Sequence, residues 1–562
     1  MSHLPIVYRL MIRIVHFRGR QCGSQPRVYM CPLTLTVKVF NLGTCSYRSL
    51  SHAFSTSGFL RNELGRITET FFAYCKDPRA ITNRKRPTAM SELPNLSTLN
   101  YTVLVPYNGS IATGGNSMEV DLNVFYNAGD ITWIITCAAL VLLMIPGVGF
   151  FYSGLARRKS ALSLIWLSVM SLGVVSFQWF FWGYSLAFSH SAGAYIGNLE
   201  NFGFKGVLAQ PSVGSSKIPD ILFALYQGMF AAIIVALAVG AVAEHGRMAP
   251  CIVFMFIWTT IIYDPLACWT WNSSGWIYKM GGLDFAGGTP VHIASGVAAL
   301  AYSLMLGKRR GQGTSDFNHR PHNVTHVVIG TVFLAILRAV MAGIVTNLAA
   351  AIGGVTWCLL DYRLNGKFSA VGFSSGVISG LVAITPGSGY VPPWAAVIFG
   401  LVGATACNYA TKLKYLMRID DFLDIFAVHG VGGIIGNLLT GLFAADYIAR
   451  LDGATYIDGG WLNKHYIQLA YQLADSVTGA AYSFIGSCII LFLINLIPGL
   501  HLRASEKDEI IGVDDAEIGE FAYDYVEIAR DVSSGFETDK SEPKSDGDSV
   551  NSTKIHGSGK ES

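Results

Sequence analysis

Two related stretches decide the fold of this chain: D-F-A-G-G-T-P-V-H-I-A-S-G at residues 284–296 and D-F-L-D-I-F-A-V-H-G-V-G-G at residues 421–433. Both fit the pattern D-F-x5-V-H-x3-G, and they lie 137 residues apart. In each copy the aspartate precedes the histidine by eight residues, which is about 12 Å along a helix. A repeated acid and histidine within apolar sequence indicates a chain built from two matched halves.

The composition around this repeat is that of a membrane protein. Of the 562 residues, 51% are hydrophobic and only 14% are charged, whereas a soluble domain carries about 25% charged residues. The 60 glycines suit helices that pack closely in lipid, because small residues let backbones approach. These values exclude the soluble globular classes and predict an all-α polytopic membrane protein.

Nine apolar stretches are long enough to cross the hydrocarbon, which takes about 20 residues. They are 131–153, 161–188, 219–242, 249–270, 284–306, 368–386, 391–411, 422–444 and 476–497. A further apolar stretch, 324–360, has 37 residues, too many for one comfortable span and too few for two crossings of about 30 Å each. Two truncated crossings here would bring the total to eleven.

Lysines and arginines in the short loops predict the orientation. They follow the first, third and fifth spans and precede 368–386 and 422–444, so they share one side only if 324–360 crosses twice. We therefore expect eleven transmembrane helices with truncated helices 6–7, an extracellular N-terminus and a cytosolic C-terminus. Helices 5 and 10 then enter from opposite faces, as an inverted repeat requires, and bring His292 and His429 to the same depth.

Charge divides the chain into segments. Residues 1–89 carry fourteen Lys/Arg and three acids, and we interpret them as a basic extension that is disordered or a gene-model artefact. Residues 90–130 form the predicted extracellular N-terminus, and 131–497 the membrane domain. Residues 504–562 carry sixteen Asp/Glu against six Lys/Arg, so 498–562 is predicted to be an acidic cytosolic regulatory tail. Its serines are candidate kinase sites, although a merely solvated tail is the commoner outcome.

The two histidines are the first candidates for function. An ionisable side chain at bilayer depth marks a functional site by default. A single such histidine is as often a hydrogen-bonded packing residue, but His292 and His429 in matched repeats favour a pore or a proton-relay pair. Asp284 and Asp421 are better interpreted as N-terminal helix caps.

Aromatic residues gather at the predicted outer mouth. W-T-W at 269–271 precedes the fifth span, and interface tryptophans are usually membrane anchors. At a pore mouth, however, Trp271 would attract a small cation through a cation–π contact. Tyr226 and Phe230 are four residues apart on the third span and share a face. Core packing is the ordinary explanation for them, and a hydrophobic gate is the functional one.

Together these motifs resemble the fungal Mep-type ammonium transporters of the Amt/Mep/Rh family, in its twin-histidine subclass. The matching stretches are P-G-V-G-F-F-Y-S-G (146–154), L-Y-Q-G-M-F (225–230), W-T-W (269–271), D-F-A-G-G-T-P-V-H (284–292), V-H-G-V-G-G-I-I-G-N (428–437), F-A-A-D-Y (443–447) and D-D-A-E-I-G-E-F-A-Y (514–523). The resemblance covers roughly residues 120–530. It implies a plasma-membrane homotrimer with one pore per subunit, serving nitrogen utilisation, and no enzyme activity.

The resemblance also implies roles for individual residues. Trp271 and Tyr226 match the recruitment position, Phe230 the gate, and His292 with His429 the twin-histidine pair that relays a proton. Structural or charge roles are expected for three further residues, namely Asp284, Asp421 and Asn437.

The physics of the substrate agrees with this assignment. Ammonium can lose a proton and potassium cannot, and a dry apolar pore penalises the charged form of an amine. Histidine, with an ordinary pKa near 6.5, suits proton transfer at neutral pH. We therefore expect NH4+ to be recruited at the aromatic mouth and deprotonated, so that NH3 crosses while the proton is relayed separately.

One departure from the family pattern concerns the sixth helix. The family block resembling W-F-G-W-F-G-F-N-G-G-S is absent between Leu334 and Arg338, a loss of about fifteen residues that matches the shortfall in span length. That block would carry the second gate phenylalanine and a recruitment serine, so neither is assigned here. A genuine deletion predicts a misfolded or inactive product, whereas a miscalled exon boundary does not.

Two other functions compete with transport. An ammonium sensor, or transceptor, with little or no transport would suit the acidic tail, and a haem protein would suit two membrane imidazoles. No further redox ligands accompany the histidines, and the ten cysteines form no C-x-x-C pair, so no metal or cofactor is predicted. A nucleic-acid partner is not predicted either. The expected partners are ammonium or ammonia, the lipid bilayer, other subunits and a kinase.

Overall fold

The computed structural model describes residues 125–311, 321–335 and 340–523. The chain separates into two units, 1–101 and 102–562, and all of the described residues belong to the second. The predicted basic extension 1–89, almost all of the 90–130 segment and the serine-rich end of the tail therefore lie outside the described residues.

Helices account for the architecture of the described residues, where ten helical segments are long and apolar enough to span a membrane. The longer elements are α3 (Ala128–Leu155), α4 (Ala161–Gln178), α6 (Asp220–Val239), α7 (Met248–Trp258), α8 (Asp264–Trp271), α10 (Ala294–Leu306), α11 (Val324–Leu334), α12 (Val340–Asn365), α13 (Ala370–Ile384), α14 (Pro393–Ala410), α16 (Gly432–Phe443) and α18 (Gln468–Leu496). The short α-helices are α5 (Tyr184–Phe188), α9 (Trp276–Met280), α15 (Leu413–Met417), α17 (Asp446–Ala449) and α19 (Glu506–Ile511).

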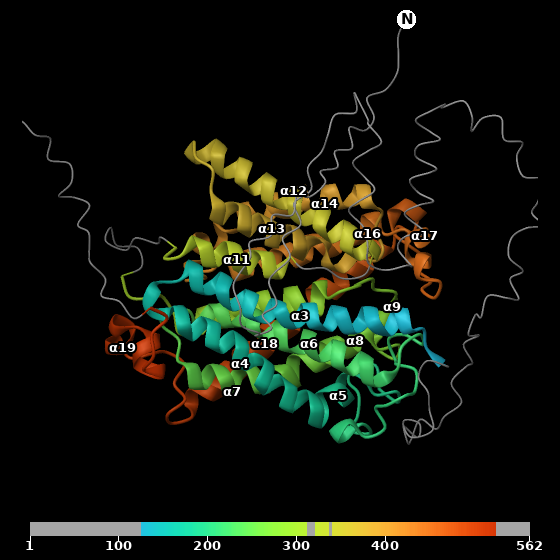
Figure 1. The fold of residues 1–562 in the computed structure, drawn as a ribbon, viewed down its shortest axis with the longest axis horizontal. Coiled ribbons are helices and arrows are strands. Elements are labelled where there is room, and N and C mark those ends of the chain that lie inside the picture. The colour runs from blue at the N-terminus through green and yellow to red at the C-terminus, as the bar shows by residue number, and fades with distance from the viewer. Residues whose placement is uncertain (1–124, 312–320, 336–339, 524–562) are drawn as a thin grey trace, which may run out of the picture. The chain divides into compact units, whose positions relative to one another are not determined.

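Five π-helical segments are part of this framework: η5 (Trp179–Gly183), η8 (Thr259–Tyr263), η9 (Gly288–Ile293), η11 (Phe426–Val431) and η14 (Asp514–Ile518). Short 3-10 turns are η4 (Arg158–Ser160), η6 (Phe202–Phe204), η7 (Gly240–Val242), η10 (Thr385–Gly387), η12 (Arg450–Asp452) and η13 (Trp461–Asn463). In Figure 1 the long helices lie side by side, with α19 at one end of the bundle and α9 and α17 at the other. The fold is that of an all-helical polytopic membrane protein.

The apolar stretch 324–360 is divided unequally between two helices. α11 has 11 residues, or about 16 Å, which is half of the ~30 Å hydrocarbon thickness. α12 has 26 residues and is long enough to cross. The predicted truncation of the sixth and seventh helices therefore falls on the sixth alone. The eleventh crossing stays a prediction, since the described residues hold ten candidate spans and this one shorter apolar helix.

The short helix α11 is held against α3 by close backbone contact. A Cβ atom at Gly330 would lie 2.5 Å from Phe151 N, and one at Gly154 would lie 2.5 Å from Asn323 O. Gly147 faces Phe333 in the same way, at 2.8 Å. Glycines at these positions let the two backbones approach, which is how small residues join helices in lipid.

The end of the bundle that carries α19 is joined by a buried ion cluster. Arg309 donates from Nη1 to Glu244 Oε2 at 2.8 Å and from Nε to Asp420 Oδ2 at 2.7 Å, and Arg157 Nε reaches the same Glu244 oxygen at 2.7 Å. Burial raises the pKa of Asp420, but the hydrogen bonds and charge of Arg309 outweigh burial and hold that pKa below its ordinary value. The tail joins this end as well, because Asp514 accepts from the N–H groups of two residues in the first turn of α4.

We predict that Gly330→Ala destabilises the protein by about 1–3 kcal/mol, since the added methyl group overpacks the α3–α11 contact. Gly173→Ala is the matched control, because no atom lies within 4 Å of a Cβ built there. That change should leave stability equal or slightly higher, as alanine is the better helix former. Thermal unfolding of purified protein measures both, and equal melting temperatures for the two variants would show that α11 does not pack as described.

Candidate functional site

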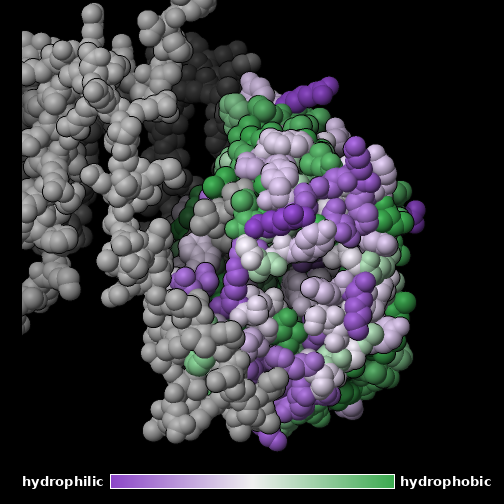
Figure 2. All heavy atoms as spheres, turned by 90° about the vertical axis from the view of Figure 1, so that its right-hand side faces the viewer, coloured by the Kyte–Doolittle hydropathy of each residue, from purple (hydrophilic) through white to green (hydrophobic). Residues whose placement is uncertain are grey.

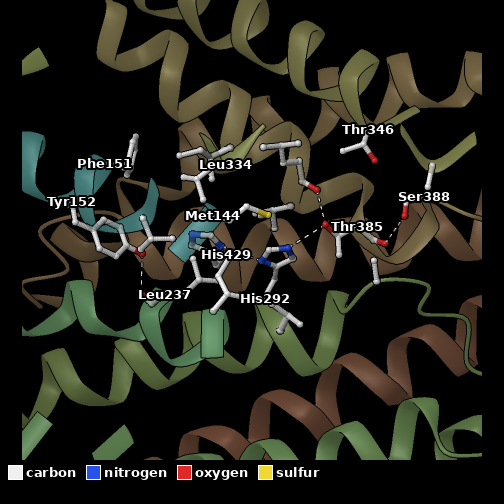
Figure 3. Close-up of a pocket in the computed structure, with 18 residues that line it drawn as sticks. Met144, Phe151, Tyr152, Leu237, His292, Leu334, Thr346, Thr385, Ser388 and His429 are labelled. Atoms are coloured by element: carbon white, nitrogen blue, oxygen red, sulfur yellow. Dashed lines mark hydrogen bonds between the residues drawn. The ribbon is translucent and has the colours of Figure 1, made fainter. Parts of the chain in front are cut away.

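Two π-helical segments bring the repeated histidines together. His292 lies in η9 and His429 in η11, each just before a regular helix, α10 or α16. Their Nδ1 atoms are 3.2 Å apart, and the rings stack with centroids 5.3 Å apart and planes 22° apart. His292 Nε2 lies 3.1 Å from Thr385 Oγ1 (Figure 3). π-helical turns occur often at functional sites.

The hydrogen bonds define which ring nitrogens carry protons. The Thr385 hydroxyl donates to Leu381 O at 2.7 Å, so Thr385 Oγ1 acts as the acceptor toward His292 Nε2–H. A neutral imidazole has one donor and one acceptor nitrogen, so His292 Nδ1 accepts and His429 Nδ1–H donates to it. The two rings and Thr385 thus form one directed chain of hydrogen bonds.

A cavity of about 90 Å³ lies beside the histidine pair. Its wall is mostly apolar, with residues such as Met144, Phe151 and Leu237 around the two rings (Figure 3). The polar groups that line it are uncharged hydroxyls and the imidazoles, contributed by Tyr152, His292, Thr346, Thr385, Ser388 and His429. No Asp, Glu, Lys or Arg is among the described residues of this wall. The cavity therefore suits a small neutral molecule with hydrogen-bonding capacity.

Each histidine segment begins at a buried aspartate that accepts backbone N–H groups. Asp284 Oδ1 accepts from Gly287 N and Gly288 N, and its Oδ2 accepts from Thr289 N, all at 2.7 Å. Asp421 accepts from the N–H groups of residues 425 and 426 at 3.0 and 2.9 Å. Both carboxylates are used within their own segment as helix caps.

The predicted aromatic residues meet beside Asp284. Trp271 Nε1 donates to Asp284 O at 2.9 Å. The ring of Phe230 lies 6.4 Å from that of Trp271 and 5.0 Å from that of Tyr226, measured between centroids. The structure therefore places these three rings and the first capping aspartate in one cluster.

The aromatic cluster lies toward the end of the bundle that carries α9. Figure 2 looks onto this end, which is largely hydrophilic, has hydrophobic atoms along its margin and is hollowed near its middle. Trp269 belongs to a separate contact, since its Nε1 donates to Tyr195 O. Of the two tryptophans in W-T-W, Trp271 is the one that forms a hydrogen bond to Asp284 and a ring contact with Phe230.

Sequence reasoning missed three polar residues. Thr385 carries no local signal, because only the tertiary fold brings it to His292. Asp475 accepts hydrogen bonds from Thr289 and Asn437, and it escaped notice because the predicted last span began at residue 476. Asp264 is fully buried within the fourth span and accepts from Gln178. The sequence feature that could have identified both acids is an ionisable residue at membrane depth.

The N-terminal end of α6, the helix that carries Tyr226 and Phe230, has a titratable contact. Asp220 is the first residue of α6 and accepts from Tyr184 and from Gln210 Nε2. His190 Nε2 lies 3.6 Å from Asp220 Oδ2. The interaction with Asp220 raises the pKa of His190 above its ordinary value, although burial acts in the opposite direction.

A raised histidine pKa stabilises the fold at pH values below the unfolded pKa of about 6.5, and the gain is lost as pH rises through the folded pKa. We therefore predict that His190→Gln lowers stability by about 0.5–1 kcal/mol in mild acid, the range for a partly exposed ion pair. Above the folded pKa the variant should match the parent chain. Melting temperatures across pH measure this, with Asp220→Asn as the control that removes the charge. A deficit independent of pH would contradict the assignment.

The chain is similar in sequence and in structure to known proteins. The model of the Ammonium Transporter Family matches residues 132–523. The chain is 61% identical over 427 residues to Ammonium transporter 1 of Schizosaccharomyces pombe, covering 73% of this chain and 86% of that protein. It is 50% identical over 433 residues to Ammonium transporter MEP2 of Saccharomyces cerevisiae, covering 73% and 87%. The crystal structure of Candida albicans Mep2 is similar with a TM-score of 0.68 and 50% identity, covering 74% of this chain and 95% of that one.

Proposed function

This chain belongs to the ammonium transporter family, as a fungal Mep-type member, and we propose a route by which its substrate crosses. Ammonium is recruited at Trp271 and Tyr226 and passes the Phe230 gate. It then gives up its proton, and NH3 moves through the cavity beside His292 and His429 while the proton is relayed by the imidazoles. The observation that carries this proposal is the contact of the two imidazoles beside a cavity with an uncharged wall.

The wall of the cavity supports passage of the neutral form. A cation moved there would exchange its water shell for aliphatic and hydroxyl groups with no carboxylate facing it, and burial of an unpaired charge is costly. Ammonia avoids that cost and can still hydrogen-bond to an imidazole. Potassium has no neutral form, so the same wall would exclude it.

The directed hydrogen bonds support the proton relay. In the arrangement described, His429 donates to His292, and His292 donates to Thr385. A proton taken up at His429 Nε2 moves the Nδ1 proton of His429 to His292 Nδ1, and the Nε2 proton of His292 leaves into the cavity that this residue lines. Both rings then hold the alternative tautomer, from which the same transfer runs in the opposite direction. Histidine is the side chain whose ordinary pKa allows such transfer near neutral pH.

We propose that the end of the bundle with α19 faces the cytosol of a plasma membrane. Arg157, Lys159, Arg309 and Arg310 lie in the connections between the long helices at this end, which agrees with the excess of basic residues on the cytosolic side of membrane proteins. The other features implied by the family are proposed with this orientation: an extracellular N-terminus, eleven helices in a 5+5 inverted repeat, a homotrimer and a tail open to a kinase.

The inverted repeat has a structural argument of its own. Asp284 follows α9 at one end of the bundle, whereas Asp421 is adjacent to Asp420, which binds Arg309 of the ion cluster at the other end. The two capped segments therefore start from opposite ends and meet at their histidines. This is the arrangement in which repeats of inverted topology build a midplane site.

One observation favours the alternative of an inactive product. Leu334 and Ala342, on either side of the shortened connection between α11 and α12, both line the cavity. The block absent from this chain would therefore join the wall of the proposed route. An ammonium sensor with little transport is the other alternative, and signalling in a transport-dead variant separates it from a carrier.

We predict that His292→Ala and His429→Ala each weaken ammonium-dependent current by about 100-fold, the lower range for loss of an acid–base group. The assay is current and radiolabelled methylammonium uptake in yeast that lacks its own ammonium transporters, with surface protein measured in parallel. His501→Ala is the control, because His501 is exposed and remote from the cavity. An unchanged current in the double His→Ala variant would overturn the relay.

The parent chain itself tests the inactive alternative. If it reaches the surface and unfolds cooperatively but carries no current, the transcript across codons 330–340 should be sequenced. Recovery of transport when the missing codons are restored would place the defect at α11. Continued inactivity of the restored chain would remove transport as its function.

A further inference from the structure

α18, which does not line the cavity, carries a row of polar side chains on one buried face. The row contains Gln468, Gln472, Asp475, Ser476, Ser483 and Ser487, each 2% exposed or less. Offsets of 4, 7, 8, 15 and 19 residues from Gln468 place them along a single side of the helix. The opposite side is apolar and exposed, as at Val477 and Ile485. We call these six residues the polar row of α18.

The polar row binds the backbone on both sides of His292. Gln472 accepts from Leu283 N and donates to Leu283 O, both at 2.7 Å, next to the capping residue Asp284. Ser483 Oγ donates to Ala294 O at 2.8 Å, two residues beyond His292. The segment that carries the first histidine is therefore attached to α18 before and after its π-helical turn.

Asp475 lies at the centre of the row and contacts both histidine helices. Thr289 Oγ1, three residues before His292, donates to Asp475 Oδ2 at 2.8 Å. Asn437, eight residues after His429, donates from Nδ2 to Thr289 Oγ1 at 2.8 Å and to Asp475 Oδ2 at 3.3 Å. One buried carboxyl oxygen thus receives hydrogen bonds from each half of the repeat.

The helices that carry these hydrogen bonds approach one another closely. A Cβ atom at Gly479 would lie 2.3 Å from Thr289 Cγ2, and one at Gly288 would lie 2.6 Å from Asn437 Oδ1. Thr289 is therefore held by its methyl group against α18 and by its hydroxyl group between Asp475 and Asn437. A displacement of Thr289 along η9 would carry His292 with it.

We propose that Asp475 is a positioning residue for permeation: acting through Thr289 and Asn437, it sets the separation of His292 and His429 without touching the cavity. This inference rests on the proposed function in one respect, namely that the two histidines lie in the path of the substrate. It adds a residue of the outer helix α18 to those that determine the geometry of the pore.

Four substitutions separate the hydrogen bonds from the bulk of the side chains. Thr289→Val removes the donating hydroxyl at constant shape, and Thr289→Ser retains it. Asp475→Leu removes the acceptor, and Asp475→Asn retains one acceptor oxygen. Ser487→Ala is the matched control, because Ser487 belongs to the same row but accepts from Trp258 Nε1, away from both histidines.

Two measurements are made on each variant. The first is the 15N spectrum of the histidine side chains in purified protein in lipid vesicles, assigned with His292→Gln and His429→Gln. The second is methylammonium uptake per surface molecule. The spectrum can be recorded whether or not the chain transports its substrate. A parent chain without uptake would therefore contradict the proposed function, while the positioning role of Asp475 could still be tested.

We expect Thr289→Val and Asp475→Leu to shift the signals of both histidines and to lower uptake between about tenfold and 100-fold, since displacing a working group by ~1 Å has such effects. Thr289→Ser, Asp475→Asn and Ser487→Ala should resemble the parent chain. The double variant Thr289→Val/Asp475→Leu should be no worse than the worse single variant, because both remove the same bond. If Asp475→Leu does not fold, Thr289→Val carries the test.

Unchanged histidine signals in folded Thr289→Val would overturn the proposal. Additive losses in the double variant would also overturn it, because Asp475 would then act by another route. Failure of Thr289→Ser to restore the signals would show that packing of the methyl group, and not the hydrogen bond, determines the geometry.

Discussion

Hydrocarbon offers no hydrogen bonds, and this constraint governs every polar group in the bundle. Backbone groups at the starts of the two histidine segments are satisfied by the carboxylates of Asp284 and Asp421. The histidines satisfy one another and Thr385. The hydroxyl of Thr289 and the amide of Asn437 are satisfied by Asp475 and Ser476. Several of these bonds join different helices, so polar side chains help to determine how the helices lie relative to one another.

That constraint also explains why the site combines a polar pair with an apolar wall. Two imidazoles that bind each other can remain neutral in a dry cavity, whereas a lone charged group would need a counter-ion there. The same wall that tolerates the pair resists a permeating cation. In the route proposed above, selectivity for a molecule that can shed its charge would follow from the neutrality of the lining, and not from a ring of ligands.

The helix α11 is well packed but too short to cross the hydrocarbon layer. It packs on α3 through glycines and keeps its internal hydrogen bonds, so a half-length helix is locally well formed. Length is a separate requirement, because a chain of 11 residues reaches about 16 Å of a ~30 Å layer. Leu334 at its end lines the cavity, so the deletion predicted from the sequence adjoins the proposed route.

The sequence by itself determined the helical membrane class, nine of the ten candidate spans and the twin D-F-x5-V-H motif, since hydrophobic length and repeat spacing are local properties. It also identified Trp271, Tyr226 and Phe230 as candidate site residues, and these three rings form one cluster. Only the tertiary structure decided that the two histidines touch at Nδ1, that Thr385 orders their protons, and that Asp475 holds both helices from behind. These contacts join residues between about 40 and 190 positions apart, and hydrogen bonding between distant segments leaves no period or spacing in a sequence.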